Sequence, residues 1–247
     1  KYHPMGSLAP RDVVARSIDH ELKISGEEFV YLDITHKDPK EVMSHFPNIY
    51  KKCLSIGIDL TKDMIPVVPA AHYCCGGIKV NLNGESSIRR LYALGEASST
   101  GLHGGNRLAS NSMMEAAVYA DAAARHAISV IDSIELQRDI PAWDYEGTAV
   151  PEEMALITQD YKEMQQIMTN YVGIVRSDVR LERAKRRLEI IFKETEELYL
   201  KSTLSQHLCE LRNMIAVGYL IIKQAEARHE SVGLHYSIDY PAKPVEI

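Results

Sequence analysis

The sequence has no excess of basic charge, few cysteines and no long apolar run. Its 247 residues carry a formal net charge of −6, so it lacks the basic surface that binds nucleic-acid phosphates, and no nucleic-acid partner is expected. No apolar span or signal-peptide pattern is present, and we therefore expect no membrane insertion. The four cysteines form no C-x-x-C pair, which argues against a structural zinc site and favours a reducing, cytoplasmic setting.

A glycine-rich turn for dinucleotide binding is also missing. No GxGxxG pattern occurs in the chain, so it has no motif that would cradle a pyrophosphate. The chain opens with KYHPMGSLAPRDVV, without an initiator methionine, and we expect it to be a piece of a longer protein. Its content of hydrophobic residues, 45%, and of charged residues, 25%, is ordinary for a globular protein and places it in that class.

The first part of the chain mixes helix and strand signals. After Pro10, apolar residues at helical spacing predict a helix, and the β-branched and aromatic stretch EEFVYLDITH predicts a strand. Asn83-Gly84 predicts a hairpin turn, because both residues tolerate a positive φ. Three further elements are expected: one or two short helices within 38–57 interrupted at Pro47, a short buried strand within 89–98, and an alanine-rich helix over about 111–134.

The last part of the chain has a different pattern, with apolar residues spaced alternately three and four apart in three long segments. This spacing is typical of helices that pack nearly antiparallel in a bundle. Ser177 or Asp178 is expected to cap the second helix. We interpret the Met and Tyr stripe of the first helix as bundle core rather than as a cofactor site. The three apolar stripes are Met154, Ile157, Tyr161, Met164, Met168 and Tyr171; Leu181, Ala184, Leu188, Ile191, Thr195 and Leu198; and Leu208, Leu211, Ile215, Gly218, Ile222 and Ala225.

Three cationic or potentially cationic side chains lie near predicted loop or helix ends: Arg11, His72 and Arg107. Arg11 could be a plain surface residue, but a cation at a helix start opposes the helix dipole, and such local conflicts are typical of functional sites. His72 could equally be a buried structural histidine. Gly104 and Gly105 let backbone or ligand approach Arg107 closely. Each signal alone is weak and indicates only a mixed α and β protein with a helical tail.

Taken together, several stretches resemble the C-terminal half of the L-aspartate oxidase family. The patterns HYxxGG and GEaxxxxxHGxNRLxxNS are typical of its wider superfamily, which includes the flavoprotein subunits of succinate dehydrogenase and fumarate reductase. The details PAAHY, TGLHG, RLASNS and VGIVRSDVRLERA favour the aspartate oxidases. The resemblance covers nearly the whole chain, through LAPRDVVARSID, FVYLDITH, IPVVPAAHYCCGGI, LYALGEASSTGLHGGNRLASNS and the ending LRNMIAVGYLIIKQAEARHESVGLHYSIDYP.

The resemblance gives the three cationic residues roles toward a small dicarboxylate. Aspartate and fumarate each carry two carboxylates, which need at least two directed cations, and arginine offers a planar bidentate fork. The resemblance implies that Arg107 binds a substrate carboxylate, that His72 hydrogen-bonds the substrate and that Arg11 is the catalytic proton-transfer residue. A free arginine holds its proton firmly, so Arg11 can act as an acid only through a relay, and steering of the carboxylates is its alternative role.

The resemblance also implies FAD as the cofactor and indicates no metal. It assigns FAD contacts to the side chain of Glu96, which would meet the sugar-like chain, and to the backbone of Ser112 and Met113. The helix that begins near Ser112 would direct N–H groups at the flavin edge where negative charge develops. In the alternative interpretation, Glu96 caps a loop or a helix and Ser112 is a plain N-cap.

The implied reaction is the two-electron oxidation of L-aspartate to iminoaspartate. The electrons then pass to O₂, which yields hydrogen peroxide, or to fumarate, which yields succinate. In the family this reaction supplies quinolinate synthase and begins NAD biosynthesis in bacteria. Because the pyrophosphate-binding turn is missing, the isolated chain is expected to hold FAD weakly and to be inactive.

The implied fold class is α+β. Residues 1–73 would be the C-terminal part of a substrate-capping domain, residues 74–143 the C-terminal part of a Rossmann-like FAD-binding domain, and residues 144–247 a three-helix C-terminal domain. Two alternatives stay open. One is a fumarate reductase or succinate dehydrogenase flavoprotein that passes electrons to an iron–sulfur subunit, and the other is a non-enzymatic interaction module that works through its helical tail.

Overall fold

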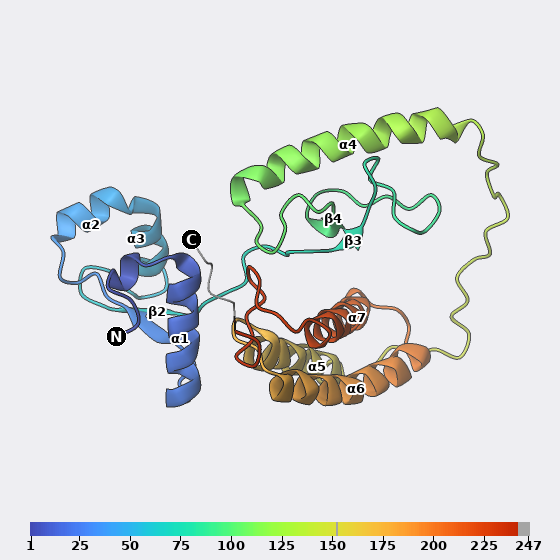
Figure 1. Cartoon of the computed structure of the whole chain (residues 1–247). Helices are drawn as coiled ribbons and strands as arrows, with labels where there is room; N and C mark the ends of the chain where they lie inside the picture. Colours follow the sequence, from blue (N-terminus) through green and yellow to red (C-terminus); the bar gives the residue numbers. More distant parts are fainter. Residues whose placement is uncertain (152, 242–247) are drawn as a thin grey trace. The chain divides into compact units, whose positions relative to one another are not determined.

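The computed structural model describes residues 1–151 and 153–241 (Figure 1). The chain divides into two compact units, Lys1–Ala71 and His72–Ile247. Each unit mixes helices with a two-stranded sheet, and the long helices of the second unit lie toward the C-terminus. The predicted combination of α and β elements with a helical C-terminal part is therefore confirmed, whereas the predicted domain boundaries stay a prediction.

The first unit packs three short helices around a small antiparallel sheet, in which Val30 lies opposite Val67. The helix predicted after Pro10 ends at Gly26, whose φ of +77° lies in the left-handed region that suits a helix C-cap. Asp38 caps the next helix. The interruption predicted at Pro47 is present, because Pro47 is the first residue of a second helix. The elements are η1 (Gly6–Leu8), α1 (Arg11–Ser25), β1 (Val30–Leu32), α2 (Pro39–His45), α3 (Pro47–Leu54) and β2 (Ile65–Val67).

The second unit begins with a short parallel sheet beside a long helix (Figure 1). Strand β3 (Ile78–Lys79) pairs with β4 (Ser98–Ser99), which follows the 3-10 helix η2 (Gly95–Ala97), and η2 contacts α4 (Ala109–Ile131). Gly77 is required where the two strands approach, because a Cβ there would lie 2.5 Å from the carbonyl oxygen of Ala97.

The buried strand predicted within residues 89–98 does not form as expected. Tyr92 makes only an isolated bridge with Glu85, and the chain turns into η2 at Gly95. Arg90 and Gly95 both have a positive φ, +68° and +63°, so the extended backbone is interrupted on either side of Tyr92. The predicted turn at Asn83-Gly84 is present, with Gly84 at a φ of +73° and its N–H donating to the carbonyl of Asn81.

Three helices complete the second unit and lie side by side (Figure 1). They are α5 (Met154–Ile167), extended by the π-helical turn η3 (Met168–Val172), α6 (Asp178–Lys201) and α7 (Gln206–Glu226). Ser177 caps α6 by accepting from the N–H of Arg180, as predicted. Most of the predicted stripe residues form one buried cluster that includes Met164, with Tyr161, Met168 and Tyr171 packed against it, which confirms the bundle-core interpretation. Met154 at the start of the first stripe is instead 44% exposed.

Candidate active site

Arg107 lies at the end of the loop that leads into α4, and its side chain is only 3% exposed. Its Nε donates to the carbonyl oxygen of Cys74 at 3.0 Å, and its Nη1 donates to Ser112 Oγ at 3.2 Å. The backbone N–H of Arg107 is held by Cys75 Sγ at 3.3 Å. A buried guanidinium that is held on two sides has a fixed orientation, which is what directed carboxylate recognition requires.

The segment that carries His72 lies beside Arg107. The ring of Tyr73 is 6.0 Å from the guanidinium carbon of Arg107, and the ring of His72 packs edge-on against Tyr73 with centroids 4.5 Å apart. His72 itself is exposed, in contrast to the buried structural histidine that was the alternative interpretation. The second unit therefore places Tyr73 and Cys74, which follow His72 in the chain, against Arg107. A shared role of His72 and Arg107 in substrate binding stays a prediction.

Arg11 lies in the first compact unit and is the first residue of α1. Pro10 precedes it at the N-cap without a side-chain hydrogen bond, and the neighbouring Asp12 pairs with Arg16 at 2.6 Å. Arg11 is exposed, so its charge at the positive end of the helix dipole is solvated rather than neutralised. Its convergence with His72 and Arg107 stays a prediction.

Glu115 on α4 is a buried carboxylate that sequence reasoning missed, and it gathers donors from the loop before α4. It accepts a hydrogen bond from Thr100 Oγ1 and another from His103 Nε2 at 2.8 Å, and it lies 3.6 Å from Arg107 Nη1. Burial would raise the pKa of Glu115, but these hydrogen bonds and the nearby charges of His103 and Arg107 outweigh it and lower the pKa below its usual value. The carboxylate is therefore ionised at neutral pH.

His103 is placed by the same carboxylate. Its Nε2 must carry a proton to donate to Glu115, whereas its Nδ1 is buried and has no hydrogen-bond partner among the described residues. Each residue of this pair stands out in the sequence by its neighbours. His103 was visible as a lone histidine among glycines, and Glu115 as a lone acid in the apolar run MMEAAV, but their contact arises only from the fold.

The residues predicted to hold FAD surround the start of α4. Leu108 at the N-cap supplies no side-chain hydrogen bond, so no side chain caps the first amides of α4, and Met113 is 80% exposed. One oxygen of the exposed Glu96 accepts from the N–H of Cys74 at 2.6 Å and so ties two loops together. Uncapped helix amides and an exposed carboxylate are the donors and acceptor that an electron-rich ring edge and a hydroxylated chain need, so these residues fit FAD.

The C-terminal turn contacts the same loop from the other side. We call this contact the clasp, formed by Gly105 with Val232–Leu234. The N–H of Leu234 donates to the carbonyl of Gly105 at 2.9 Å, and a Cβ on Gly233 would lie 2.1 Å from that carbonyl oxygen. The clasp connects the helical part of the unit to the loop that holds His103 and Arg107.

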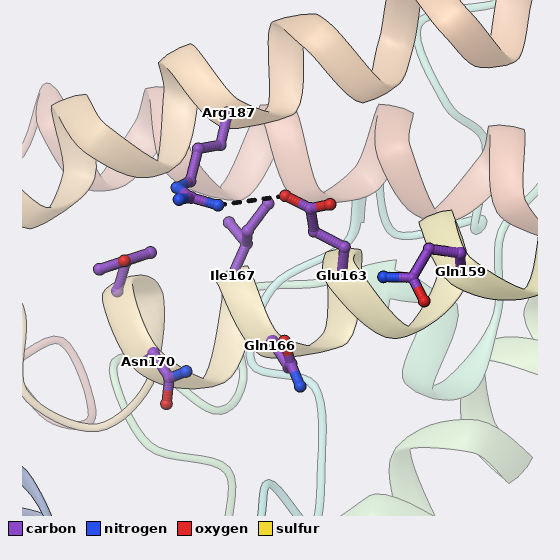
Figure 2. A pocket seen from close by; sticks show the side chains of 7 residues that line it. Gln159, Glu163, Gln166, Ile167, Asn170 and Arg187 are labelled. Carbon is purple, nitrogen blue, oxygen red and sulfur yellow. Dashed lines mark hydrogen bonds and ion pairs between the residues drawn. The ribbon is translucent and has the colours of Figure 1, made fainter. Parts of the chain in front are cut away.

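A polar hollow of about 270 Å³ lies elsewhere, on the surface of α5, η3 and α6. Figure 2 shows Glu163 and Arg187 across it, joined at 3.1 Å, and none of the predicted site residues lines it. Within residues 1–151 and 153–241, no group of three or more His, Cys, Asp or Glu side chains is placed to hold a metal ion. No helix in the described part of the chain is long and apolar enough to cross a membrane.

Comparison with known proteins connects this geometry to one family. Residues 3–113 match the family model of an FAD binding domain, and residues 161–244 match that of the fumarate reductase flavoprotein C-terminus. The L-aspartate oxidase of Yersinia pestis is 49% identical over 97% of this chain, and the match covers 45% of that protein. The L-aspartate oxidase of Pseudomonas aeruginosa is 46% identical over 98% of this chain, again covering 45% of the relative. The chain is similar to L-aspartate oxidases over nearly its whole length.

Solved structures show a similar fold in related flavoproteins. Mycobacterium smegmatis Sdh1 in complex with UQ1 superposes with a TM-score of 0.78 at 29% identity over 96% of this chain and 42% of that chain. Escherichia coli quinol fumarate reductase superposes with a TM-score of 0.73 at 26% identity, over 96% of this chain and 44% of that one. The predicted resemblance to L-aspartate oxidases and the prediction of FAD as the cofactor are thereby confirmed. The chain spans less than half the length of the curated relatives it matches.

Proposed function

We propose that this chain is the C-terminal part of an FAD-dependent L-aspartate oxidase that converts L-aspartate to iminoaspartate in the cytoplasm, at the start of NAD biosynthesis. The observation that carries the proposal is the buried, oriented guanidinium of Arg107 in a chain 49% identical to an L-aspartate oxidase. In this proposal residues 1–73 end the substrate-capping domain, residues 74–143 end the FAD-binding domain and residues 144–247 form the helical domain.

Each of the three proposed substrate residues has its own role. Arg107 binds one carboxylate of L-aspartate, and His72 donates a hydrogen bond to the substrate from the neighbouring segment. Arg11 supplies a second cation, which steers the dicarboxylate and, with a relay, moves a proton. FAD, when bound, would supply the two-electron acceptor for the hydride of Cα, with O₂ or fumarate as the final acceptor, and the substrate nitrogen would lose a proton as the C=N bond forms.

The start of α4 would bind the edge of the flavin ring. Amides at the start of α4, whose N-cap Leu108 supplies no side-chain hydrogen bond, would donate to the ring edge where negative charge develops, beside Ser112 and Met113, and the helix dipole would add to that stabilisation. The free oxygen of Glu96 would accept from hydroxyl groups of the sugar-like chain. The product iminoaspartate would pass to quinolinate synthase.

The proposal is tested by L-aspartate-dependent hydrogen peroxide formation in the full-length, FAD-loaded protein without any partner subunit. Replacing Arg107 with Ala should lower kcat/KM for L-aspartate by about 100-fold or more, the usual cost of removing a directed charge-stabilising donor. Arg125→Ala is the matched control, because Arg125 lies on an exposed face of α4, the helix that follows Arg107, and pairs only with Asp121 among the described residues. Equal activity of the Arg107→Ala variant and the parent would overturn the assignment of Arg107.

A second candidate function is a fumarate reductase or succinate dehydrogenase flavoprotein, favoured by the superposition on Sdh1 with a TM-score of 0.78. It would use the same three residues but deliver electrons to an iron–sulfur subunit. Fumarate reduction or succinate oxidation that requires a partner subunit, with no peroxide formed from L-aspartate, would identify this function instead.

A further inference from the structure

The side chain of Glu115 is 1% exposed, and it collects three groups from the loop between residues 100 and 107. Thr100 at the start of the loop and His103 in its middle both hydrogen-bond the carboxylate. Arg107 at the end of the loop faces it with Nη1. One acid in the second turn of α4 therefore fixes the start, the middle and the end of this loop relative to the helix.

The negative charge of Glu115 helps to orient the guanidinium of Arg107. A buried carboxylate is stable only when it is paired and hydrogen-bonded, and Glu115 has both a cation and two hydrogen-bond donors. In the same way the buried guanidinium of Arg107 requires a counter-charge. The ion pair thus determines which edge of the guanidinium faces the protein.

The remaining bonds of Arg107 show which nitrogen is left for a ligand. Its Nε is engaged with the carbonyl of Cys74, and its Nη1 is engaged with Ser112 and Glu115. Within residues 1–151 and 153–241, its Nη2 makes no hydrogen bond. Arginine carries two N–H donors on that nitrogen, which is enough to bind a carboxylate oxygen directly.

We propose that Glu115 is a positioning residue that holds Arg107 so that Nη2 is presented to a substrate carboxylate, and that Thr100 and His103 hold Glu115 in place for this purpose. The inference rests on the proposed role of Arg107 in binding a dicarboxylate. Glu115 itself touches neither substrate nor reacting atoms. It acts by adding a charged partner to the hydrogen bonds with Cys74 and Ser112 that also orient the guanidinium.

The experiment uses the full-length, FAD-loaded protein and the Glu115→Gln variant, which keeps the shape of the side chain and removes its charge. We expect KM for L-aspartate and Kd for succinate, measured through the flavin absorbance change, to rise about 10- to 100-fold, as couplings between contacting residues predict. The value of kcat should change by less than about threefold, because the lost interaction acts on substrate binding. Glu115→Asp should recover part of the affinity.

Two controls separate positioning from folding. Asp121→Asn removes an acid from the exposed side of the same helix and should leave KM and Kd unchanged. In an Arg107→Ala background, Glu115→Gln should add little further loss, because its effect passes through Arg107. A variant whose melting temperature falls while KM and Kd match the parent, or whose losses are simply additive with those of Arg107→Ala, would overturn the proposal.

The succinate measurement keeps this inference separate from the proposed function. A protein that reduces fumarate but does not oxidise L-aspartate would contradict the oxidase assignment. In that protein, a higher Kd for succinate in the Glu115→Gln variant would still support the positioning role, and an unchanged Kd would still overturn it.

Discussion

The bundle of α5, α6 and α7 and the site-bearing part of the second unit, residues 72–131, are held together in different ways. The three helices of the bundle bury their large apolar side chains against one another, and Leu208, Leu211 and Ile222 are fully buried. Helix α4 leaves Met113, Met114 and Ile128 mostly exposed. Burial of apolar surface therefore stabilises the bundle, whereas directed polar contacts such as those of Glu115 and Arg107 hold the site.

This difference shows why the two regions respond to different kinds of substitution. Truncating an apolar side chain in the bundle removes transfer free energy and leaves a cavity, so the loss appears as global stability. Truncating a polar side chain around Arg107 leaves a buried partner unsatisfied, and the loss appears in the geometry of the site. The contrast predicts that substitutions in the bundle core cost more stability than substitutions at the clasp.

The largest effect is expected in the bundle. Leu211→Ala should lower the free energy of unfolding by about 2–5 kcal/mol, because this side chain is fully buried in the cluster. Chemical denaturation followed by the helical signal of circular dichroism measures this. Ile128→Ala, in the exposed face of α4, should cost less than about 0.5 kcal/mol. Similar losses for the two variants would remove the contrast between the regions.

A smaller effect is expected at the clasp. Gly233→Ala should cost roughly 1–3 kcal/mol, because its Cβ would meet the carbonyl oxygen of Gly105 at 2.1 Å. Faster amide hydrogen exchange at residues 104–107 would report the disturbed loop. Gly147→Ala is the matched control, since Gly147 also has a positive φ, +78°, but has nothing within 4 Å of an added Cβ. The clasp would be unimportant if the two variants exchanged alike.

The smallest effect concerns the pH dependence of the turn that carries the clasp. Burial lowers the pKa of His235, and the nearby charge of Arg176, whose Nη1 donates to His235 Nδ1 at 2.7 Å, lowers it further. The folded state therefore binds a proton on His235 less readily than the unfolded state does. Because protonation then favours unfolding, stability is lost as the pH falls through the ordinary histidine pKa of about 6.5. Denaturation midpoints at pH 7.5 and 5.5 measure this loss.

A His235→Gln variant isolates the contribution of this histidine from that of the carboxylates. The difference in stability between pH 7.5 and 5.5 should be smaller in the variant than in the parent. If both proteins lost the same stability on acidification, His235 would not be the group that titrates.

Regular periodicity made the helical part predictable from the sequence. The three-and-four spacing located α5, α6 and α7, and Ser177 marked the start of α6, because capping and apolar stripes are local rules. The prediction of a strand around Tyr92 was wrong. A strand needs a partner strand, which the sequence does not reveal, and the positive φ of Arg90 and Gly95 interrupts the extended backbone on either side of Tyr92.

The site was only partly predictable. Family patterns pointed to Arg107 and to the segment of His72, which the fold brings together through Tyr73 and Cys74. Glu115 was missed, because a single buried acid has no periodic signature. Its importance depends on contacts with residues 12 and 15 positions away in the chain, which only the folded structure reveals.

The most direct test of the proposed site is a crystal structure of the full-length, FAD-loaded protein with succinate bound. We expect Nη2 of Arg107 to lie within about 3 Å of a succinate carboxylate oxygen while Nη1 stays on Glu115. Succinate bound without contact to Arg107, or Glu115 turned away from the guanidinium in that complex, would contradict it.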